Sequence, residues 1–153
     1  MALKIFISYS TKDLHVVNFV QSMLAGSPVE VFVAEYSVHA GQPLSQSIIA
    51  AIKACDLFML LWSKNSEQSD WVPQEIGIAR GEGKQIIPVV LQSGLKLPGF
   101  ISDLKYLDVP QDPQGAFTWL RDNVFARANQ KQQQEAIAWL ALGGAILWLL
   151  SKK

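Results

Sequence analysis

The sequence predicts an α/β protein built on a parallel sheet with helices on both faces. Two observations lead to this fold class. Short runs of mostly apolar, often β-branched residues recur along the chain, with apolar side chains at successive rather than alternate positions, which is typical of strands buried on both faces. Segments with the helical spacing of apolar residues separate these runs, and such alternation is typical of parallel sheets.

The first half of the chain supplies three expected strands and two expected helices. Residues 13–25 place apolar side chains on one broad helical face, and Gly26-Ser27-Pro28 ends that helix. A polar loop at residues 35–43 precedes a second helix, for which Ser45 or Ser47 can act as the N-cap. The three expected strands are residues 3–8, 29–33 and 56–62.

The second half continues the alternation. A loop at residues 63–70 leads into a helix from about Trp71 to Gly81, with Pro73 in the first turn, where proline is tolerated. The remaining expected elements are a strand at 85–91, a long irregular connection, a short fifth strand at 104–107 and a closing helix at 115–128.

Bulk composition limits the classes of function. The length of 153 residues suits one domain with a short appendage. Thirteen basic and thirteen acidic residues cancel, which argues against nucleic acid as a partner, because phosphate contacts need a basic surplus. The single cysteine, Cys55, has no intramolecular disulfide partner and lies in an apolar run, so we expect it to be buried, in a reducing compartment. No cleavable signal is expected at the N-terminus.

The C-terminal part of the chain differs from the rest. We expect three units: a domain at 1–128, a polar linker at 129–135 and a hydrophobic helix at 136–151. Residues 136–150 carry no charged side chain, and Trp139 and Trp148 lie near the two ends of this run, as in the aromatic belts of membrane proteins.

Three interpretations of the hydrophobic helix stay open. As a helix, the run from 136 to 150 spans about 22 Å, which is short for a bilayer core of about 30 Å. It is an anchor that holds a cytoplasmic domain at a membrane, a contact in a helix bundle with another protomer, or a helix lying on a membrane surface. The last is the least favoured, because the run has no polar face.

Ligands of open parallel sheets bind outside the carboxyl ends of the strands. The segments expected at this edge are Ser8-Tyr9-Ser10, Glu35-Tyr36-Ser37, Ser63-Lys64-Asn65 and the start of the helix at Trp71. The common phosphate-binding glycine loops and the nucleophile-elbow motif are absent. His15, His39 and Cys55 lack metal-ligand spacing, so no metal site is expected.

Trp71 and Glu75 form the most informative pair. They are four residues apart, so they share one face of their helix. An aromatic ring beside a carboxylate suits a substrate with a flat base and a ribose. A core tryptophan beside a surface glutamate has the same spacing on any amphipathic helix, and spacing alone favours that structural interpretation.

Four segments, in order and at normal spacing, resemble the motifs of TIR domains. The resemblance covers roughly residues 3–127 and implies a flavodoxin-like TIR fold with a parallel five-stranded sheet, here followed by the C-terminal hydrophobic helix. The four segments are Phe6-Ile-Ser-Tyr-Ser-x-x-Asp13, the loop after the second strand from Val31 to Gly41, Leu60-Leu-Trp-Ser63-x-Asn65-Ser66 and Ser69-Asp-Trp71-Val-Pro-Gln-Glu75.

The last segment resembles the Ser-x-Trp-x-x-x-Glu motif of the enzymatic, bacterial-type members, which cleave NAD+. The resemblance implies that Glu75 is catalytic and that NAD+ is the substrate, with no separate cofactor. The residues expected to contact the substrate are Trp71, Tyr9, Ser10, Tyr36 and Ser63. The resemblance also implies a homo-oligomer, in which the loop after the second strand of one TIR domain closes the site of another. The residues expected in this assembly loop are Glu35, His39, Gly41 and Pro43.

The sequence departs from the family pattern at a few positions. Ala34 stands where many bacterial relatives have aspartate, and Ala40 replaces the usual proline before Gly41. These differences affect the expected loop conformation but leave Glu75 in place.

A single carboxylate is chemically sufficient for this reaction. Ordinary glycosidases use two carboxylates, one of which protonates a poor leaving group. Nicotinamide leaves NAD+ from a cationic pyridinium and departs neutral, so no general acid is needed. A carboxylate near the ribose can stabilise the positive charge that develops there or capture it covalently.

Three functions therefore compete. The first is an NAD+ glycohydrolase or ADP-ribosyl cyclase, activated by oligomerisation and acting in bacterial antiphage defence. The second is a non-enzymatic adaptor that works through TIR–TIR contacts. In the third, the hydrophobic helix is itself the effector and disrupts membranes.

Overall fold

A computed structural model of the chain describes residues 2–34 and 44–151. Five parallel strands form one sheet in the order β2-β1-β3-β4-β5. The strands are β1 (Leu3–Ser8), β2 (Val29–Val33), β3 (Leu57–Trp62), β4 (Ile86–Val90) and β5 (Leu107–Asp108). The predicted α/β fold with a parallel five-stranded sheet is confirmed.

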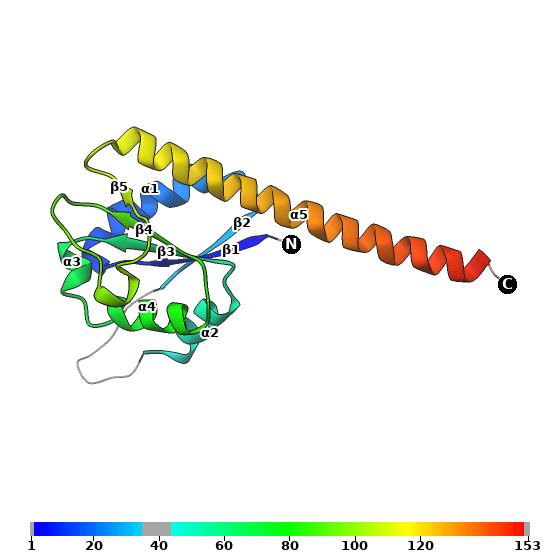
Figure 1. Cartoon of the computed structure of the whole chain (residues 1–153), viewed down its shortest axis with the longest axis horizontal. Coiled ribbons are helices and arrows are strands. Elements are labelled where there is room, and N and C mark those ends of the chain that lie inside the picture. The colour runs from blue at the N-terminus through cyan, green and yellow to red at the C-terminus, as the bar shows by residue number, and fades with distance from the viewer. Residues whose placement is uncertain (1, 35–43, 152–153) are drawn as a thin grey trace.

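Helices cover both faces of the sheet (Figure 1). One face lies against α1 and the first part of α5, and the other lies against α2 and α4. The helices are α1 (Leu14–Leu24), α2 (Gln46–Ala54), α3 (Lys64–Glu67), α4 (Val72–Gly81) and α5 (Pro113–Ser151), with 3-10 turns at Thr11–Asp13 and Gly99–Ile101.

Side-chain alternation along the strands divides the core into two layers. In β1, Ile5 and Ile7 belong to the layer under α1 and α5, whereas Phe6 belongs to the layer under α2 and α4. Phe6 stacks on Phe58 of the neighbouring strand with the ring centroids 5.4 Å apart. Because both layers are apolar, β3 and β4 are continuous apolar runs that are buried throughout.

Local signals place the helix ends where the sequence indicates. The Ser45 hydroxyl accepts a hydrogen bond from the Ile48 N–H at 3.3 Å and so caps α2. Pro73 lies in the first turn of α4, where its missing N–H costs nothing. After α4, Gly83 adopts a φ of +68°, a left-handed conformation that glycine takes without strain.

Two strands differ from expectation. The fifth strand is Leu107–Asp108 rather than residues 104–107, and it pairs only with the end of β4, where Val89 and Val90 lie opposite. Its length of two residues is too short for a periodic pattern to locate. The second strand lies where it was predicted but is half-buried, because it forms an edge of the sheet.

The expected linker at residues 129–135 is not an irregular break. It is helical and continues α5, which runs without interruption over 39 residues. Glutamine, lysine and glutamate, which make up six of these seven residues, are good helix formers, so polar composition there does not imply a loop. The division of the chain into domain, linker and hydrophobic segment otherwise remains a prediction. No helix in the described part of the chain is both long and apolar enough to cross a membrane.

The distal part of α5 extends well beyond the sheet (Figure 1). Ala128 is fully buried against the sheet. Further along, Ile137, Trp139, Leu140 and Leu142 are 65%, 74%, 76% and 56% exposed. Helix α5 therefore belongs to the core up to Ala128 and projects from the domain further along. We call residues 136–150 of this projecting part the apolar rod.

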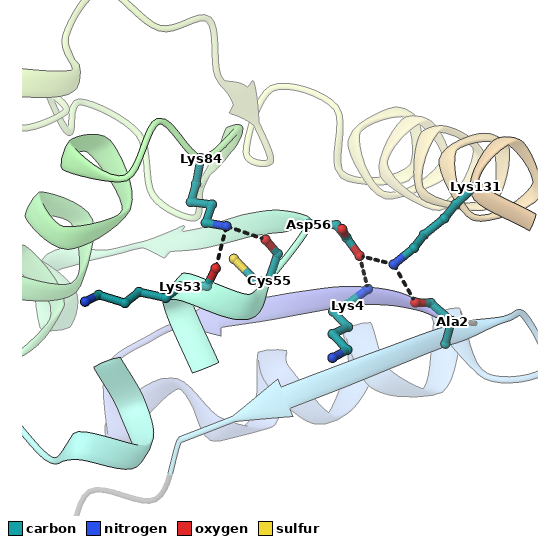
Figure 2. Close-up of polar contacts among 7 residues, drawn as sticks. All are labelled: Ala2, Lys4, Lys53, Cys55, Asp56, Lys84 and Lys131. Carbon is teal, nitrogen blue, oxygen red and sulfur yellow. Dashed lines mark hydrogen bonds and ion pairs between the residues drawn. The ribbon is translucent and has the colours of Figure 1, made fainter. Parts of the chain in front are cut away.

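Polar contacts anchor α5 just before it leaves the domain (Figure 2). The Lys131 ammonium donates to the Asp56 carboxylate at 2.8 Å and to the carbonyl of Ala2 at 3.1 Å. The Lys4 backbone N–H donates to the same Asp56 oxygen at 2.8 Å. Burial works to raise the pKa of Asp56, but the hydrogen bonds and positive charges of Lys131 and Lys4 outweigh burial and hold that pKa below its ordinary value.

A second lysine holds the turn between α2 and β3, next to Asp56 (Figure 2). The Lys84 ammonium donates to the carbonyls of Lys53 and Cys55 at 2.6 and 3.0 Å. Cys55 is buried, as predicted. This burial, opposed in part by the positive charge of Lys84, raises the pKa of its thiol.

Candidate functional site

The centre of the candidate site is the carboxyl edge of β1 and β3. The chain leaves β1 toward one face of the sheet and leaves β3 toward the other, so this edge is the switch point at which flavodoxin-like sheets bind ligands. Ser8 ends β1, and Ser63 follows β3 directly.

Glu75 lies in the first turn of α4 and is fully buried, with 0% exposure. The Ser8 hydroxyl donates a hydrogen bond of 2.7 Å to Glu75 Oε1. A buried carboxylate is costly unless it is hydrogen-bonded, so the end of β1 supplies a partner that this side chain needs. The glutamate is therefore not the surface residue that the structural interpretation of the Trp71–Glu75 spacing assumed.

Trp71 lies one turn before Glu75, at the N-cap of α4. It is partly buried and packs against the core layer under α2 and α4. Its carbonyl accepts the Glu75 N–H at 3.0 Å, and the Ser69 hydroxyl accepts the N–H groups of Trp71 and Val72 at 3.2 and 3.3 Å. Ser69 thus fixes the start of the helix that carries the carboxylate.

A second buried carboxylate, Asp13, lies on the other side of the same edge and is 6% exposed. The Ser63 hydroxyl donates to Asp13 Oδ2 at 2.5 Å, and the Asn65 amide donates to Asp13 Oδ1 at 3.0 Å. Ser63 also caps α3 by accepting the Ser66 N–H at 3.1 Å. This cluster ties the segment after β1 to the segment after β3.

A polar hollow of about 260 Å³ opens between these two segments. Tyr9 and Ser10 line it but are 4% and 8% exposed. The Tyr9 hydroxyl donates to the carbonyl of Ala34 at 2.6 Å, which joins the ends of β1 and β2. The other lining residues are Thr11, Lys12, Asn65, Gln68, Ser69 and Asp70. Glu75 is not part of this lining.

Comparison with known proteins decides the family. A TIR domain family model matches residues 5–121. The chain belongs to the TIR domain family. No curated protein matches it.

Solved structures resemble the fold of this chain at low sequence identity. The TIR domain of the Toll-related receptor TRR-2 from Hydra magnipapillata is 22% identical, with a TM-score of 0.63 over 78% of this chain and 96% of that chain. The TIR domains of the Roq1 resistosome are 16% identical, with a TM-score of 0.51 over 84% of each chain. A 2-deoxyribosyltransferase from Leishmania mexicana is 17% identical, with a TM-score of 0.50 over 78% and 97%. At these identities the likeness concerns the fold alone.

The structure places only part of the predicted site of this TIR domain. Tyr9 and Ser10 share one hollow, Ser63 lies beside it in the Asp13 cluster, and Trp71 and Glu75 begin α4. Tyr36 and the predicted assembly residues Glu35, His39, Gly41 and Pro43 lie outside the described residues. Within residues 2–34 and 44–151, no cluster of histidine, cysteine and acidic side chains is placed to hold a metal ion.

The sequence interpretation did not assign roles to Ser8, Asp13 or Asn65. All three occur in the segments that resemble TIR motifs. Polar residues recur there at or just after the ends of apolar strands, and this pattern is the signal that could have identified them. A serine at the end of an otherwise apolar strand has to pair with a polar partner when it is buried, and Glu75 is that partner here.

Proposed function

We propose that this TIR domain cleaves the bond between nicotinamide and ribose in NAD+, as a glycohydrolase or ADP-ribosyl cyclase with Glu75 as the catalytic carboxylate. The observation that carries the proposal is the placement of Glu75. It is a buried carboxylate, hydrogen-bonded to Ser8, at the carboxyl edge of the sheet and within the Ser-x-Trp-x-x-x-Glu motif.

The reaction needs little more than one correctly placed negative charge. As the bond from ribose C1′ to the pyridinium nitrogen breaks, its electron pair neutralises that nitrogen, and positive charge develops on the ribose. The Glu75 carboxylate stabilises this charge electrostatically. Water then attacks C1′ and releases a proton to give ADP-ribose, or the adenine ring of the same molecule attacks to give a cyclic product. Trp71 is the aromatic side chain one helical turn away that can hold a flat ring.

Access to Glu75 requires a change of state, because its side chain is fully buried. We propose that TIR–TIR contacts supply this change when a homo-oligomer forms, with residues 35–43 as the assembly loop. The projecting apolar part of α5 concentrates the chains on one another or at a membrane. A nucleotide-depleting enzyme activated by clustering fits a role in antiphage defence, in a protein whose TIR domain lies in the cytoplasm.

The direct test is nicotinamide release from NAD+ by the full-length protein at low and high protein concentration. Glu75→Gln should lower the rate by roughly 100-fold or more, the range observed when a transition-state electrostatic partner is removed. Glu67→Gln changes an exposed glutamate on the neighbouring α3 and should leave the rate unchanged. Chromatography of the nucleotide products separates hydrolysis from cyclisation. Equal rates for wild type and Glu75→Gln would remove Glu75 from the mechanism.

A non-enzymatic adaptor is the second candidate, and the complete burial of Glu75 favours it. In that case the Ser8–Glu75 hydrogen bond holds α4 on β1 and has no chemical role. The adaptor predicts no nicotinamide release by wild type at any concentration. It also predicts that self-association is lost on changing the loop, for example by Gly41→Pro, and is kept in Glu75→Gln.

A further inference from the structure

A larger hollow lies at the same edge of the sheet but on the face covered by α1 and α5. Its volume is about 590 Å³, within the range of about 300–1,000 Å³ for small-molecule sites. Residues that follow β1, β3, β4 and β5 all contribute to its wall, so it occupies the position at which parallel sheets bind ligands. It meets the smaller polar hollow at Lys12 and Asn65, which line both.

One side of this hollow is aromatic. Phe19 of α1 is 52% exposed, and its ring meets Phe117 of α5 edge to face, with the centroids 4.9 Å apart and an angle of 75°. Val16, Leu91 and Val109 add apolar surface beside the two rings. Exposed phenylalanine on a core-facing helix leaves apolar surface in water, and a flat ring placed against Phe19 would cover it.

Two side-chain amides, those of Asn65 and Gln92, also line the hollow, and each uses only one of its two polar groups in the hydrogen bonds described next. The Asn65 NH2 group donates to Asp13, while the Gln92 side-chain oxygen accepts the Lys64 N–H at 2.8 Å. Each side chain is thus held by one hydrogen bond. Among the described residues, nothing pairs with the Asn65 side-chain oxygen or the Gln92 NH2 group. The hollow therefore presents one fixed acceptor and one fixed donor beside an aromatic wall.

We infer that this hollow binds a planar heteroaromatic ligand of the nucleobase class, with its ring against Phe19 and its donor–acceptor edge on Asn65 and Gln92. A nucleobase or a carboxamide-bearing pyridine has both a flat π-face and adjacent donor and acceptor atoms. Lys12 also lines the hollow and supplies a positive charge for a phosphate attached to the ligand. Glu75 does not line this hollow, although Asp13, Ser63 and Asn65 of the candidate site do, and the inference does not depend on the proposed NAD+ cleavage.

The test is calorimetric titration of the full-length protein with adenosine, AMP and nicotinamide as probes. At least one probe should bind saturably, and tighter binding of AMP than of adenosine would assign the phosphate to Lys12. Phe19→Ala should weaken binding by about tenfold, since base–aromatic stacking commonly contributes that much, and Gln92→Ala should also weaken it. Leu14→Ala, on the same helix and 47% exposed but outside the hollow, should change affinity by less than about twofold, as expected of a surface substitution.

Glu75→Gln changes the proposed catalytic site but no residue that lines this hollow. This variant should therefore bind the probes as wild type does. Circular dichroism establishes that each variant is folded, and Gln92→Ala carries the test if Phe19→Ala is not. The inference is overturned if no probe binds, or if Phe19→Ala and Gln92→Ala bind as tightly as wild type. It is also overturned if Phe19→Ala lowers the oligomeric state in light scattering while no probe binds, because the phenylalanine is then covered by a second copy of the chain.

Discussion

Two buried carboxylates, those of Glu75 and Asp13, accept hydrogen bonds at the carboxyl edge of the sheet. Glu75 reaches β1 through Ser8, and Asp13 reaches the segment after β3 through Ser63 and Asn65. Each joins segments that are far apart in the sequence. Because a charge left without partners in a low-dielectric interior is costly, these contacts specify how the loops around the site are arranged.

At the scale of single residues, we predict that Ser8→Ala lowers the free energy of unfolding. The change leaves the buried Glu75 carboxylate with one donor fewer, which typically costs about 1–3 kcal/mol. Urea unfolding followed by circular dichroism measures the loss. The matched control is Ser22→Ala, which removes an exposed hydroxyl that donates to the carbonyl of Asn18 in α1 and should change stability by less than about 0.5 kcal/mol. Equal losses in the two variants would mean that the Ser8–Glu75 hydrogen bond adds nothing to stability.

The sequence could locate Trp71 and Glu75 but not their surroundings. Spacing on a helix predicts which side chains share a face, and the motif register singles out Glu75. Whether that face points inward depends on which strand the helix packs against, and this is a tertiary property. For that reason the partnership with Ser8, 67 residues away in the chain, could not be deduced from either local pattern.

At the scale of elements, prediction was most accurate where burial is uniform. The strand Leu3–Ser8 was placed correctly because it is apolar apart from Lys4 and the terminal serine and is buried apart from Lys4, and because Tyr9-Ser10-Thr11 ends the apolar run. The fifth strand was predicted at residues 104–107 and lies at Leu107–Asp108, because a strand of two residues is too short for a periodic pattern to locate. The polar composition of residues 129–135 predicts a linker, and α5 continues through them because their glutamine, lysine and glutamate side chains favour a helix.

We predict that the anchor of α5 is sensitive to acid. The folded-state pKa of Asp56 is lowered, so the pair with Lys131 contributes stability above the unfolded pKa of about 3.9. That contribution is lost as the pH falls through the lower folded-state value. Lys131→Met should therefore cost about 1 kcal/mol near neutral pH, a small value because Asp56 is 36% exposed and solvent screens the pair.

Urea unfolding of wild type and Lys131→Met across the acid range measures this effect. The difference between the two proteins should shrink as the pH falls below about 4. Lys105→Met, which removes a lysine from the exposed connection before β5, should show no such convergence. A difference that stays constant with pH would assign the role of Lys131 to its hydrogen bond with the carbonyl of Ala2 alone.

At the scale of the whole molecule, the chain combines a TIR domain that buries its core with an apolar rod that exposes large apolar side chains. The domain buries both faces of its sheet, whereas the rod leaves Trp139 and Leu140 about three-quarters exposed. Exposed apolar surface of this extent marks an interaction site rather than a stable solvent-facing helix.

Removal of residues 137–153 should therefore change association but not the fold. This truncation keeps Lys131 and every helical turn that contacts the sheet, so the thermal midpoint should stay within about 2 °C of the full-length value. Light scattering should show the truncated chain as smaller than the full-length protein at equal concentration. A truncated chain with a much lower midpoint would show that the distal helix supports the domain.

The unbroken course of α5 has a geometric consequence. A continuous helix turns by about 100° and advances by about 1.5 Å for each residue, so the azimuth of Trp139 relative to the sheet is set by the number of residues between them. One residue inserted between 132 and 136 would rotate the apolar rod by about 100°, whereas seven would return it to within about 20° of its first direction. Any surface that holds the rod thereby also sets the direction in which the edge carrying Glu75 faces, and with it which neighbouring domain that edge can meet.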